Sequence, residues 1–154
     1  MRKTAFVKIS GDLVFRQDVL EWIKDLSQSH FVVICVGGGS QINEEFQRRG
    51  IEIDFGPLGR ETKNFPERQL ARDILERNQA KVQDLLAENG INAVVVIPVL
   101  NIGSVLCHVN GDVYTRAAYL GFDKLFVVTG EARKADKEKT FEGLGKIKVI
   151  GFPD

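Results

Sequence analysis

"VVICVGGGSQINEEF", residues 32–46, joins an apolar run, three consecutive glycines and the start of a helical pattern. The continuous apolar, β-branched run over residues 31–36 predicts a strand that is covered on both faces of a sheet. Ile42 and Phe46 lie four residues apart, which predicts an amphipathic helix that begins near Ser40. A buried strand that leads directly into a helix is typical of α/β folds with mainly parallel sheets.

The rest of the chain repeats this alternation of strand and helix. The patterns predict further strands at residues 5–9, 93–99, 104–109, 124–129 and 146–152, and helices at residues 19–26, 66–89 and 114–120. Residues 51–65 are predicted to form a loop, and residues 132–139 a polar connector. We therefore expect an α/β fold, a three-layer α/β/α sandwich with a mainly parallel central sheet, in a single domain over residues 1–154.

The composition is typical of a globular chain and excludes several classes of protein. Of the 154 residues, 44% are hydrophobic and 27% are charged, unlike the composition of disordered proteins. The 21 basic and 21 acidic residues cancel, so we expect neither nucleic acid nor a membrane as a partner. Cys35 and Cys107 lie in apolar segments without metal or disulfide spacing, and the N-terminus resembles neither a signal peptide nor a membrane span. We expect a cytoplasmic protein.

Small and polar residues follow the predicted strands at the points where the strands end. Ligands of parallel sheets bind outside the carboxyl ends of the strands, so these residues are expected to meet at one edge. Glycine lets a ligand approach bare backbone, and the start of the following helix presents unpaired amides to an anion. We predict that small residues of these strand ends bind phosphate or carboxylate: Ser10, Gly11, Gly37, Gly38 and Gly39. The alternative is a strand-to-helix turn without a ligand.

Three other side chains are candidates for the site, and two of them have equally plausible structural roles. Lys8 lies inside an apolar strand, where its charge needs an anion, unless the strand is at an edge and Lys8 reaches solvent. Asn78 interrupts the apolar stripe of the long helix and contacts either a ligand or core backbone. Arg60, beside a glycine, is predicted to hold a carboxylate through two hydrogen bonds. His30 and His108 are isolated, so no metal site is predicted from protein ligands alone.

Four stretches together resemble the amino acid kinase superfamily, which includes acetylglutamate, aspartate, carbamate and uridylate kinases. They are VKISG (residues 7–11), VVICVGGGSQINEEFQRRGIEIDF (32–55), GRET (59–62) and ILERNQAKVQDLLAENGINAVVV (74–96). The glycine-rich stretch is most similar to acetylglutamate kinases, and the helix with Asn78 also resembles uridylate kinases. The resemblance covers about the first hundred residues and implies the fold of the family's N-terminal lobe, which binds the phosphoryl acceptor.

The resemblance also implies roles for individual residues. Lys8 resembles the lysine that stabilises the transferring phosphoryl group in these kinases. Gly11, Gly37 and Gly38 resemble the backbone positions that surround this group. Arg60 resembles the arginine that holds the carboxylate of the acceptor in acetylglutamate kinases.

The later segment VNGDVYTRAAYLGFDKLFVVTGEARK, residues 109–134, aligns with the family in two ways. In one, it resembles the family's Asn-x-Asp segment, so that Asn110 belongs to the site and Asp112 organises the catalytic lysines. In the other, Asp112 is an ordinary turn residue. The acidic residue that the family has after the next strand is replaced by Gly130. The second catalytic lysine is not assigned by the sequence, because three lysines of the polar connector are available: Lys134, Lys137 and Lys139.

Two functions follow as hypotheses. The first is a small kinase that transfers a phosphoryl group from ATP, with Mg²⁺, to a small molecule that bears a carboxylate or phosphate; both cofactors are implied by the resemblance only. The second is a non-catalytic relative of the acceptor lobe that binds an anionic metabolite or serves in oligomerisation. In both cases the expected partner is a small anionic metabolite, and a homo-oligomer is expected. A flavodoxin-like module rests on fold analogy alone.

Overall fold

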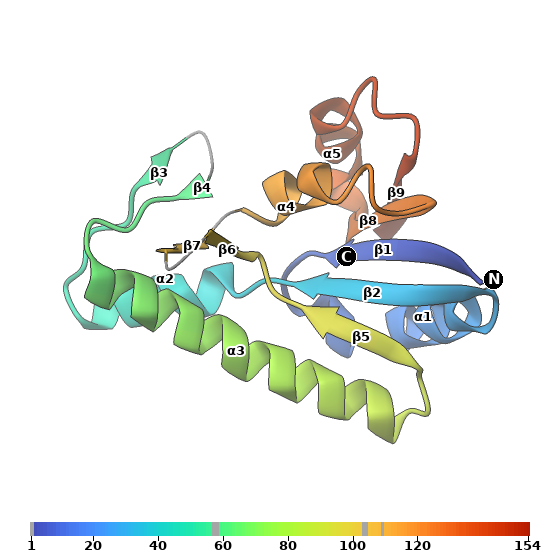
Figure 1. Cartoon of the computed structure of the whole chain (residues 1–154), viewed down its shortest axis with the longest axis horizontal. Coiled ribbons are helices and arrows are strands. Elements are labelled where there is room, and N and C mark those ends of the chain that lie inside the picture. The colour runs from blue at the N-terminus through green and yellow to red at the C-terminus, as the bar shows by residue number, and fades with distance from the viewer. Residues whose placement is uncertain (1, 57–58, 103–104, 109) are drawn as a thin grey trace.

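The computed structural model of the chain describes residues 2–56, 59–102, 105–108 and 110–154, with side chains except at residues 12, 100–102 and 105–108. The central strands are β1 (Lys3–Ile9), β2 (His30–Val36), β5 (Ala93–Val96), β8 (Lys124–Gly130) and β9 (Ile147–Phe152). They form one sheet in the order β5-β2-β1-β8-β9, and all pairs are parallel. The predicted α/β fold with a mainly parallel sheet is therefore confirmed (Figure 1).

The remaining elements are helices and two small antiparallel hairpins. The hairpins pair β3 (Phe55–Gly56) with β4 (Gly59–Arg60), and β6 (Val99–Ile102) with β7 (Val105–His108). The α-helices are α1 (Gln17–Ser29), α2 (Gly39–Arg48), α3 (Phe65–Glu88), α4 (Gly111–Ala117) and α5 (Lys134–Thr140). There are also two short 3-10 helices in the described residues. Helix η1 (Gly11–Phe15) is separated from the end of β1 by one residue, and η2 (Glu131–Arg133) directly follows β8.

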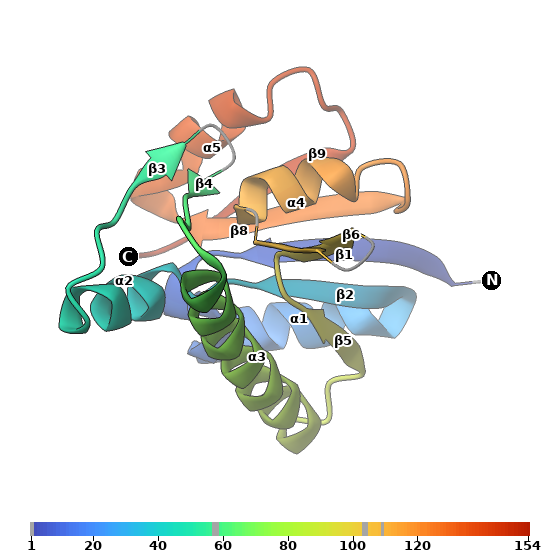
Figure 2. The same ribbon diagram turned by 60° about the vertical axis from the view of Figure 1, so that its left-hand side comes forward.

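The sheet is the middle layer of three. Along a strand, successive side chains point to opposite faces. On β1, Val7 and Ile9 face the main apolar cluster, which also contains residues of α1 and α3. Phe6 faces the other side and contacts Tyr114 of α4. Figure 2 shows the sheet nearly edge-on, with α1 and α3 on one side and α4 and α5 on the other.

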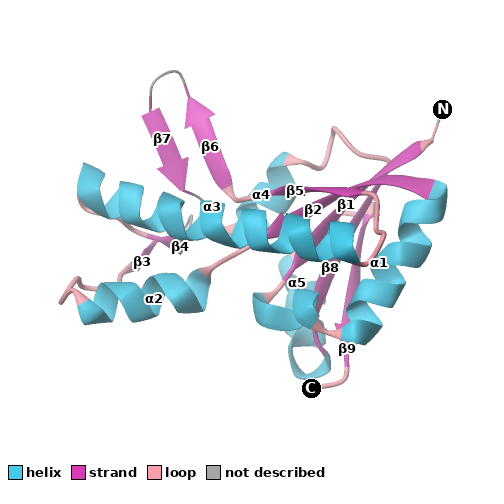
Figure 3. Cartoon of the chain, turned by 90° about the horizontal axis from the view of Figure 1, so that it is seen from below, coloured by secondary structure: helices cyan, strands magenta, loops and turns pink. Residues whose placement is uncertain are grey.

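Helix α3 packs against both α2 and the central sheet. The side chain of Asn64 caps its first turn by accepting a hydrogen bond from the amide of Glu67 at 3.0 Å. Leu75 packs against Ile42 and Phe46 of α2 in a second apolar cluster, whereas the later turns of α3 join the main core. Figure 3 shows α2 lying beside the first half of α3. Because α3 contacts both α2 and the sheet, it fixes the glycine loop that connects them.

The structure differs from the sequence prediction in several segments. The predicted loop at residues 51–65 contains the β3–β4 hairpin, whose two-residue strands are too short to show a pattern. The predicted connector at residues 132–139 is helical in η2 and α5, since its Lys, Ala and Glu residues favour helix and the buried Phe141 anchors its end. The predicted strand at residues 93–99 divides into β5 and β6 at Pro98, which lacks an amide hydrogen.

Two smaller predictions concern single side chains. Strand β2 is not covered along both faces, because Phe31 at its start is 49% exposed. Cys35 is buried, as predicted.

The side chains of Cys107 and His108 lie outside the described residues. Among the described residues, no helix combines the length and apolar composition needed to cross a membrane.

The free edge of β5 is paired with glutamine side chains instead of another strand. Gln83 of α3 donates to the carbonyl of Ala93 at 3.0 Å and accepts from the amide of Val95 at 3.0 Å. Gln79, one turn earlier, donates to the carbonyl of Val95 at 2.7 Å. An exposed sheet edge can pair with another chain, so these amides both stabilise β5 and block that pairing.

Gln83→Leu tests the importance of this edge pairing. We expect the free energy of unfolding to fall by about 1–2 kcal/mol, because two hydrogen bonds are lost and the amide of Val95, a residue that is 3% exposed, is left unpaired. Urea denaturation measures this change. Gln28→Leu in α1, an exposed position, is the matched control. Equal effects of the two substitutions would contradict the role given to Gln83.

Candidate functional site

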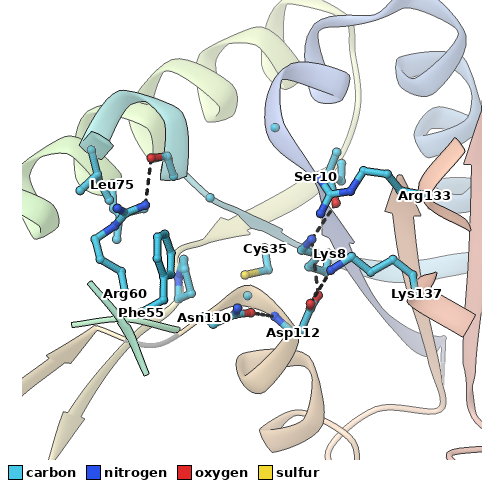
Figure 4. Close-up of a pocket in the computed structure, with 18 residues that line it drawn as sticks. Lys8, Ser10, Cys35, Phe55, Arg60, Leu75, Asn110, Asp112, Arg133 and Lys137 are labelled. Carbon is cyan, nitrogen blue, oxygen red and sulfur yellow. Dashed lines mark hydrogen bonds and ion pairs between the residues drawn. The ribbon is translucent and has the colours of Figure 1, made fainter. Parts of the chain in front are cut away.

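A cavity of about 250 Å³ opens at the carboxyl ends of the central strands, as predicted for a parallel sheet. Figure 4 shows its lining side chains converging from both sides of the sheet edge. The residues come from eight segments of the chain: Lys8, Ile9, Ser10, Gly11, Cys35, Gly37, Gly38, Gly39, Ile42, Phe55, Arg60, Leu75, Pro98, Asn110, Gly111, Asp112, Arg133 and Lys137. All of the predicted site residues except Asn78 are among them.

Lys8 lies in the floor of the cavity on an interior strand. Strand β1 is paired with β2 on one side and with β8 on the other, so the alternative of an edge strand with an outward lysine is wrong. The side chain of Lys8 is nevertheless only 14% exposed, and its ammonium group donates to the hydroxyl of Ser10 at 2.7 Å. A largely buried charge of this kind needs partners or an anion.

Asp112 lies between two lysines. Its Oδ1 is 3.5 Å from the Nζ of Lys8, and its Oδ2 accepts a hydrogen bond from the Nζ of Lys137 at 2.5 Å. Asp112 is placed at the start of α4 because the side chain of Asn110 caps this helix, accepting from the amide of Asp112 at 2.6 Å. The cap also starts the helix at Gly111, earlier than the predicted residue 114. Asp112 is therefore not an ordinary turn residue.

The charges of this triad influence one another. Burial lowers the pKa of Lys8 below its ordinary 10.5; Asp112 raises it and Lys137 lowers it again. Burial by itself would raise the pKa of Asp112, but the ammonium groups of Lys8 and Lys137 outweigh this and hold it below 3.8. Burial also raises the pKa of the Cys35 thiol to about 12, so the side chain beside Lys8 is uncharged. The cavity floor therefore keeps an excess of positive charge near neutral pH.

The glycine loop, residues 37–39, forms one wall and leads into α2. The helix begins after Gly38, whose carbonyl accepts a hydrogen bond from the amide of Ile42 at 2.9 Å. The first amides of a helix have no carbonyl one turn back, so those of Gly39 and Ser40 are suited to an anion. A side chain at Gly38 would collide with α3, since a Cβ there would lie 2.8 Å from the Nδ2 of Asn78. Glycine is needed here for close packing of loop and helix.

Asn78 supports the glycine loop from behind. Its Nδ2 donates to the carbonyl of Gly37 at 3.1 Å. The side chain therefore has the structural role of bonding to backbone, one of the two roles that the sequence left open. It does not line the cavity that contains Lys8, but it does line a neighbouring one.

Arg60, on strand β4, closes the side of the cavity that lies away from Lys8 and Asp112 (Figure 4). It donates to the carbonyl of Gly39 at 3.0 Å and to the Oδ1 of Asn43, and its guanidinium lies 5.1 Å from the ring centroid of Phe55. Within the described part of the chain, no carboxylate forms an ion pair with it, and its buried Nε has no hydrogen-bond partner. Two of the five guanidinium donors are used and the Nε donor is buried, so two remain for a ligand.

Several lining residues could not be found from the sequence. Lys137 is selected from three candidate lysines only because α5 is helical and turns it toward Asp112. Arg133, from η2, lies beside Ser10 in Figure 4, and no sequence motif points to it. Phe55 belongs to a hairpin that the sequence did not predict. These residues reach the cavity through contacts between segments that are far apart in the chain, and a sequence pattern within one segment does not reveal such contacts.

Comparison with known proteins shows similarity in fold alone. No model of a protein family matches the chain, and no curated protein matches it in sequence. The structure of smu.665 from Streptococcus mutans UA159 is similar with a TM-score of 0.62 at 16% identity, over 84% of this chain and 73% of that chain.

N-acetylglutamate synthase from Neisseria gonorrhoeae is also similar. The structure complexed with coenzyme A and L-arginine has a TM-score of 0.60 at 12% identity, and the structure complexed with coenzyme A and N-acetyl-glutamate has 0.57 at 13%. Both alignments cover 98% of this chain but only 57% and 55% of the synthase chain, so the chain spans little more than half of that protein. The similarity indicates an amino acid kinase-like fold.

Gly38→Ala tests the close packing behind the glycine loop. The added methyl group would meet the Nδ2 of Asn78 at 2.8 Å and the Cδ2 of Leu75 at 3.2 Å. We expect a loss of about 1–3 kcal/mol in the free energy of unfolding, measured by urea denaturation, because the loop must move away from α3. Gly37→Ala is the matched control, since a Cβ at Gly37 meets nothing within 4 Å. A stable Gly38→Ala protein would rule out this packing constraint.

The lowered pKa of Lys8 predicts how anion binding depends on pH. Sulfate keeps its charge over the alkaline range, so its affinity reports on the protein alone. We expect its affinity to fall as pH rises, with a midpoint below 10.5, because Lys8 loses its proton more readily than a free lysine. Asp112→Asn should move the midpoint to lower pH, because the carboxylate raises the pKa of Lys8. Isothermal titration calorimetry measures both, and a midpoint unchanged by Asp112→Asn would count against the coupling.

Proposed function

We propose that the chain is a small phosphotransferase of the amino acid kinase type. It transfers a phosphoryl group from ATP to a carboxylate or phosphate of a small anionic molecule. The observation that supports this most directly is the triad of Lys8, Asp112 and Lys137, in which one carboxylate holds two ammonium groups at the cavity floor. Phosphoryl transfer depends mainly on such positioning and charge stabilisation.

The charge of the cavity suits a ligand with several negative charges. Among the described residues that line it, four side chains are basic and one is acidic. Three of the basic groups gather near the end of β1 and Asp112: Lys8, Arg133 and Lys137. Arg60 lies apart from them, beside the hairpin. This separation suits two anionic groups, a phosphoryl group at the lysines and an acceptor carboxylate at Arg60.

The proposed reaction needs no proton transfer when the acceptor is a carboxylate. An oxygen atom of the acceptor, held by Arg60, forms a bond to the phosphorus of the terminal phosphoryl group. The bond from that phosphorus to the bridging oxygen breaks, and its electron pair leaves with the diphosphate. Lys8 and Lys137 donate to the oxygen atoms whose negative charge shifts during the transfer, and the amides of the glycine loop do the same from the opposite wall.

Mg²⁺ would supply further charge neutralisation on the phosphates of the donor. Asp112 is the one carboxylate among the described residues that line the cavity, and both its oxygen atoms face ammonium groups. This arrangement does not suit a carboxylate ligand for a cation. The side chains that line the cavity therefore fit a magnesium ion that is held by the phosphate oxygen atoms of the donor and by water, and not by the chain itself.

A second candidate function is the binding of an anionic metabolite without catalysis. N-acetylglutamate synthase, which is similar in fold, is named for a synthase activity and not for a kinase activity. The same basic cavity would hold a carboxylate or phosphate ligand in either case. Homo-oligomerisation and a cytoplasmic location remain predictions for both functions.

Lys137→Ala separates the two functions. With ATP and Mg²⁺ as donor and acetylglutamate, aspartate or UMP as acceptor, we expect ADP formation by the unmodified chain. We expect Lys137→Ala to lower kcat by about 100-fold or more, because a charged donor to the transferring group is lost. A coupled assay for ADP measures the rate.

Lys139→Ala is the control for this substitution. Lys139 lies two residues further along α5 and is exposed, and we expect the rate to be unchanged. If no acceptor supports ADP formation while one of them raises the melting temperature, the binding function is correct and the phosphotransferase is excluded. Equal rates for Lys137→Ala and the unmodified chain would exclude the role given to Lys137.

A further inference from the structure

A second cavity, of about 360 Å³, adjoins the first. The two share five lining residues, which are Gly11, the three glycines of the loop at residues 37–39, and Arg133. The second cavity extends from these residues toward η1 and α3, where its wall includes Phe15 and Lys81. None of the residues on the acceptor side, Phe55, Arg60 and Asn110, lines it. The glycine loop therefore separates an acceptor side from a second compartment.

Arg133 stands where the two cavities meet. It belongs to η2, which follows the carboxyl end of β8. Figure 4 shows its side chain directed toward Ser10, on the opposite side of Lys8 from Asp112. Among the described residues, no carboxylate pairs with Arg133 and no side-chain or carbonyl oxygen accepts a hydrogen bond from its guanidinium. All five of its donors are available to an anion that reaches from one cavity into the other.

Lys81 brings a second unpaired charge to this compartment from α3. Its Nζ lies 4.8 Å from the ring centroid of Phe15 and forms no ion pair with a described carboxylate. The amide of Asn78 and the start of α2 also face this cavity. No acidic side chain is present among the described residues that line it. The compartment is therefore basic, and it is large enough for more than one phosphate.

We propose that this second cavity holds the diphosphate part of the phosphoryl donor. The proposal rests on the proposed function, because it takes the transferring group to lie at Lys8 and the glycine loop. In an in-line transfer the leaving oxygen lies opposite the attacking oxygen. The acceptor is held on the side of Arg60, so the leaving diphosphate extends to the other side of the loop. There Arg133 and Lys81 bind its charge.

The diphosphate can come from two sources, a nucleotide or an inorganic polyphosphate. The wall of the cavity that contains Val14, Phe15 and Val82 is apolar, and the exposed ring of Phe15 would contact an apolar group attached to the diphosphate. The shared chemistry is the pair of linked phosphates. Separate measurements with ADP, pyrophosphate and tripolyphosphate distinguish the sources.

The test compares pyrophosphate with orthophosphate binding by isothermal titration calorimetry at fixed pH and ionic strength. We expect pyrophosphate to bind about tenfold more tightly or better than orthophosphate, because only pyrophosphate reaches both compartments. Lys81→Ala should weaken pyrophosphate binding by about tenfold, as expected for one lost hydrogen bond to a charged group. It should leave orthophosphate binding within about twofold. Arg133→Ala should weaken pyrophosphate binding at least as much.

Arg77→Ala is the matched control. It removes the same charge from α3 one turn before Lys81, at an exposed position that does not line the second cavity. We expect it to leave pyrophosphate affinity within about twofold. Equal losses in Arg77→Ala and Lys81→Ala would overturn the proposal, because general attraction to a basic surface would then explain the binding. Thermal melting of each variant checks that it is folded, and both side chains are exposed enough to be removed without loss of the core.

The outcomes for the subsite and for the proposed function are distinguishable. Pyrophosphate binding that depends on Lys81, without ADP formation from ATP in any assay, supports the subsite and excludes ATP as the phosphoryl donor. ADP formation with pyrophosphate binding that does not depend on Lys81 overturns the subsite alone. If ADP binding also depends on Lys81, the diphosphate comes from a nucleotide. If only pyrophosphate and tripolyphosphate depend on it, the donor is an inorganic polyphosphate.

Discussion

The burial of the Lys8 ammonium group inside a parallel sheet is the constraint on which the site depends. An interior strand offers a lysine no direct path to bulk water, and an unpaired charge there would cost several kcal/mol. The chain meets this cost with one partner close to Lys8 in the sequence and one from a distant segment. Ser10 accepts a hydrogen bond two residues later, and Asp112 approaches from the start of α4. The position of α4 is thus coupled to a single charge on β1.

Glycines occur where this coupling requires close approach. A Cβ at Gly111 would lie 3.1 Å from the Cε of Lys8, so the stem of the lysine passes directly against the backbone of the α4 cap. At Gly59, with φ of +109°, a Cβ would lie 2.5 Å from the Cβ of Asn110, so the β3–β4 hairpin rests on the same segment. The β3–β4 hairpin, the N-terminal cap of α4 and the side chain of Lys8 are therefore in contact around Asn110 and Gly111. A displacement of any of these three parts would move Arg60 relative to Lys8.

The sequence predicts the parts of this structure that depend on local pattern. The apolar run of β2, the three consecutive glycines of the loop and the helical periodicity of the 24-residue helix α3 can each be recognised within one segment of the sequence. It does not identify Lys137, Arg133 or the glutamine pairing along β5, because each depends on the packing of two segments far apart in the chain. For Lys8 and Asn78 the local pattern allows two roles, and the neighbouring strand or loop decides between them.

The presence of Asp112 favours catalysis over simple binding. A carboxylate in a basic cavity repels an anionic ligand, so a site that only binds anions gains affinity if the acid is absent. Asp112 instead raises the pKa of Lys8 against the lowering effect of burial, and it forms an ion pair with Lys137. Fixed, protonated donors matter most where negative charge moves during a reaction, because they need no reorganisation in the transition state. In the proposed phosphoryl transfer, the carboxylate would lower affinity for the ground state and would keep the groups that face the transferring phosphoryl group in fixed positions.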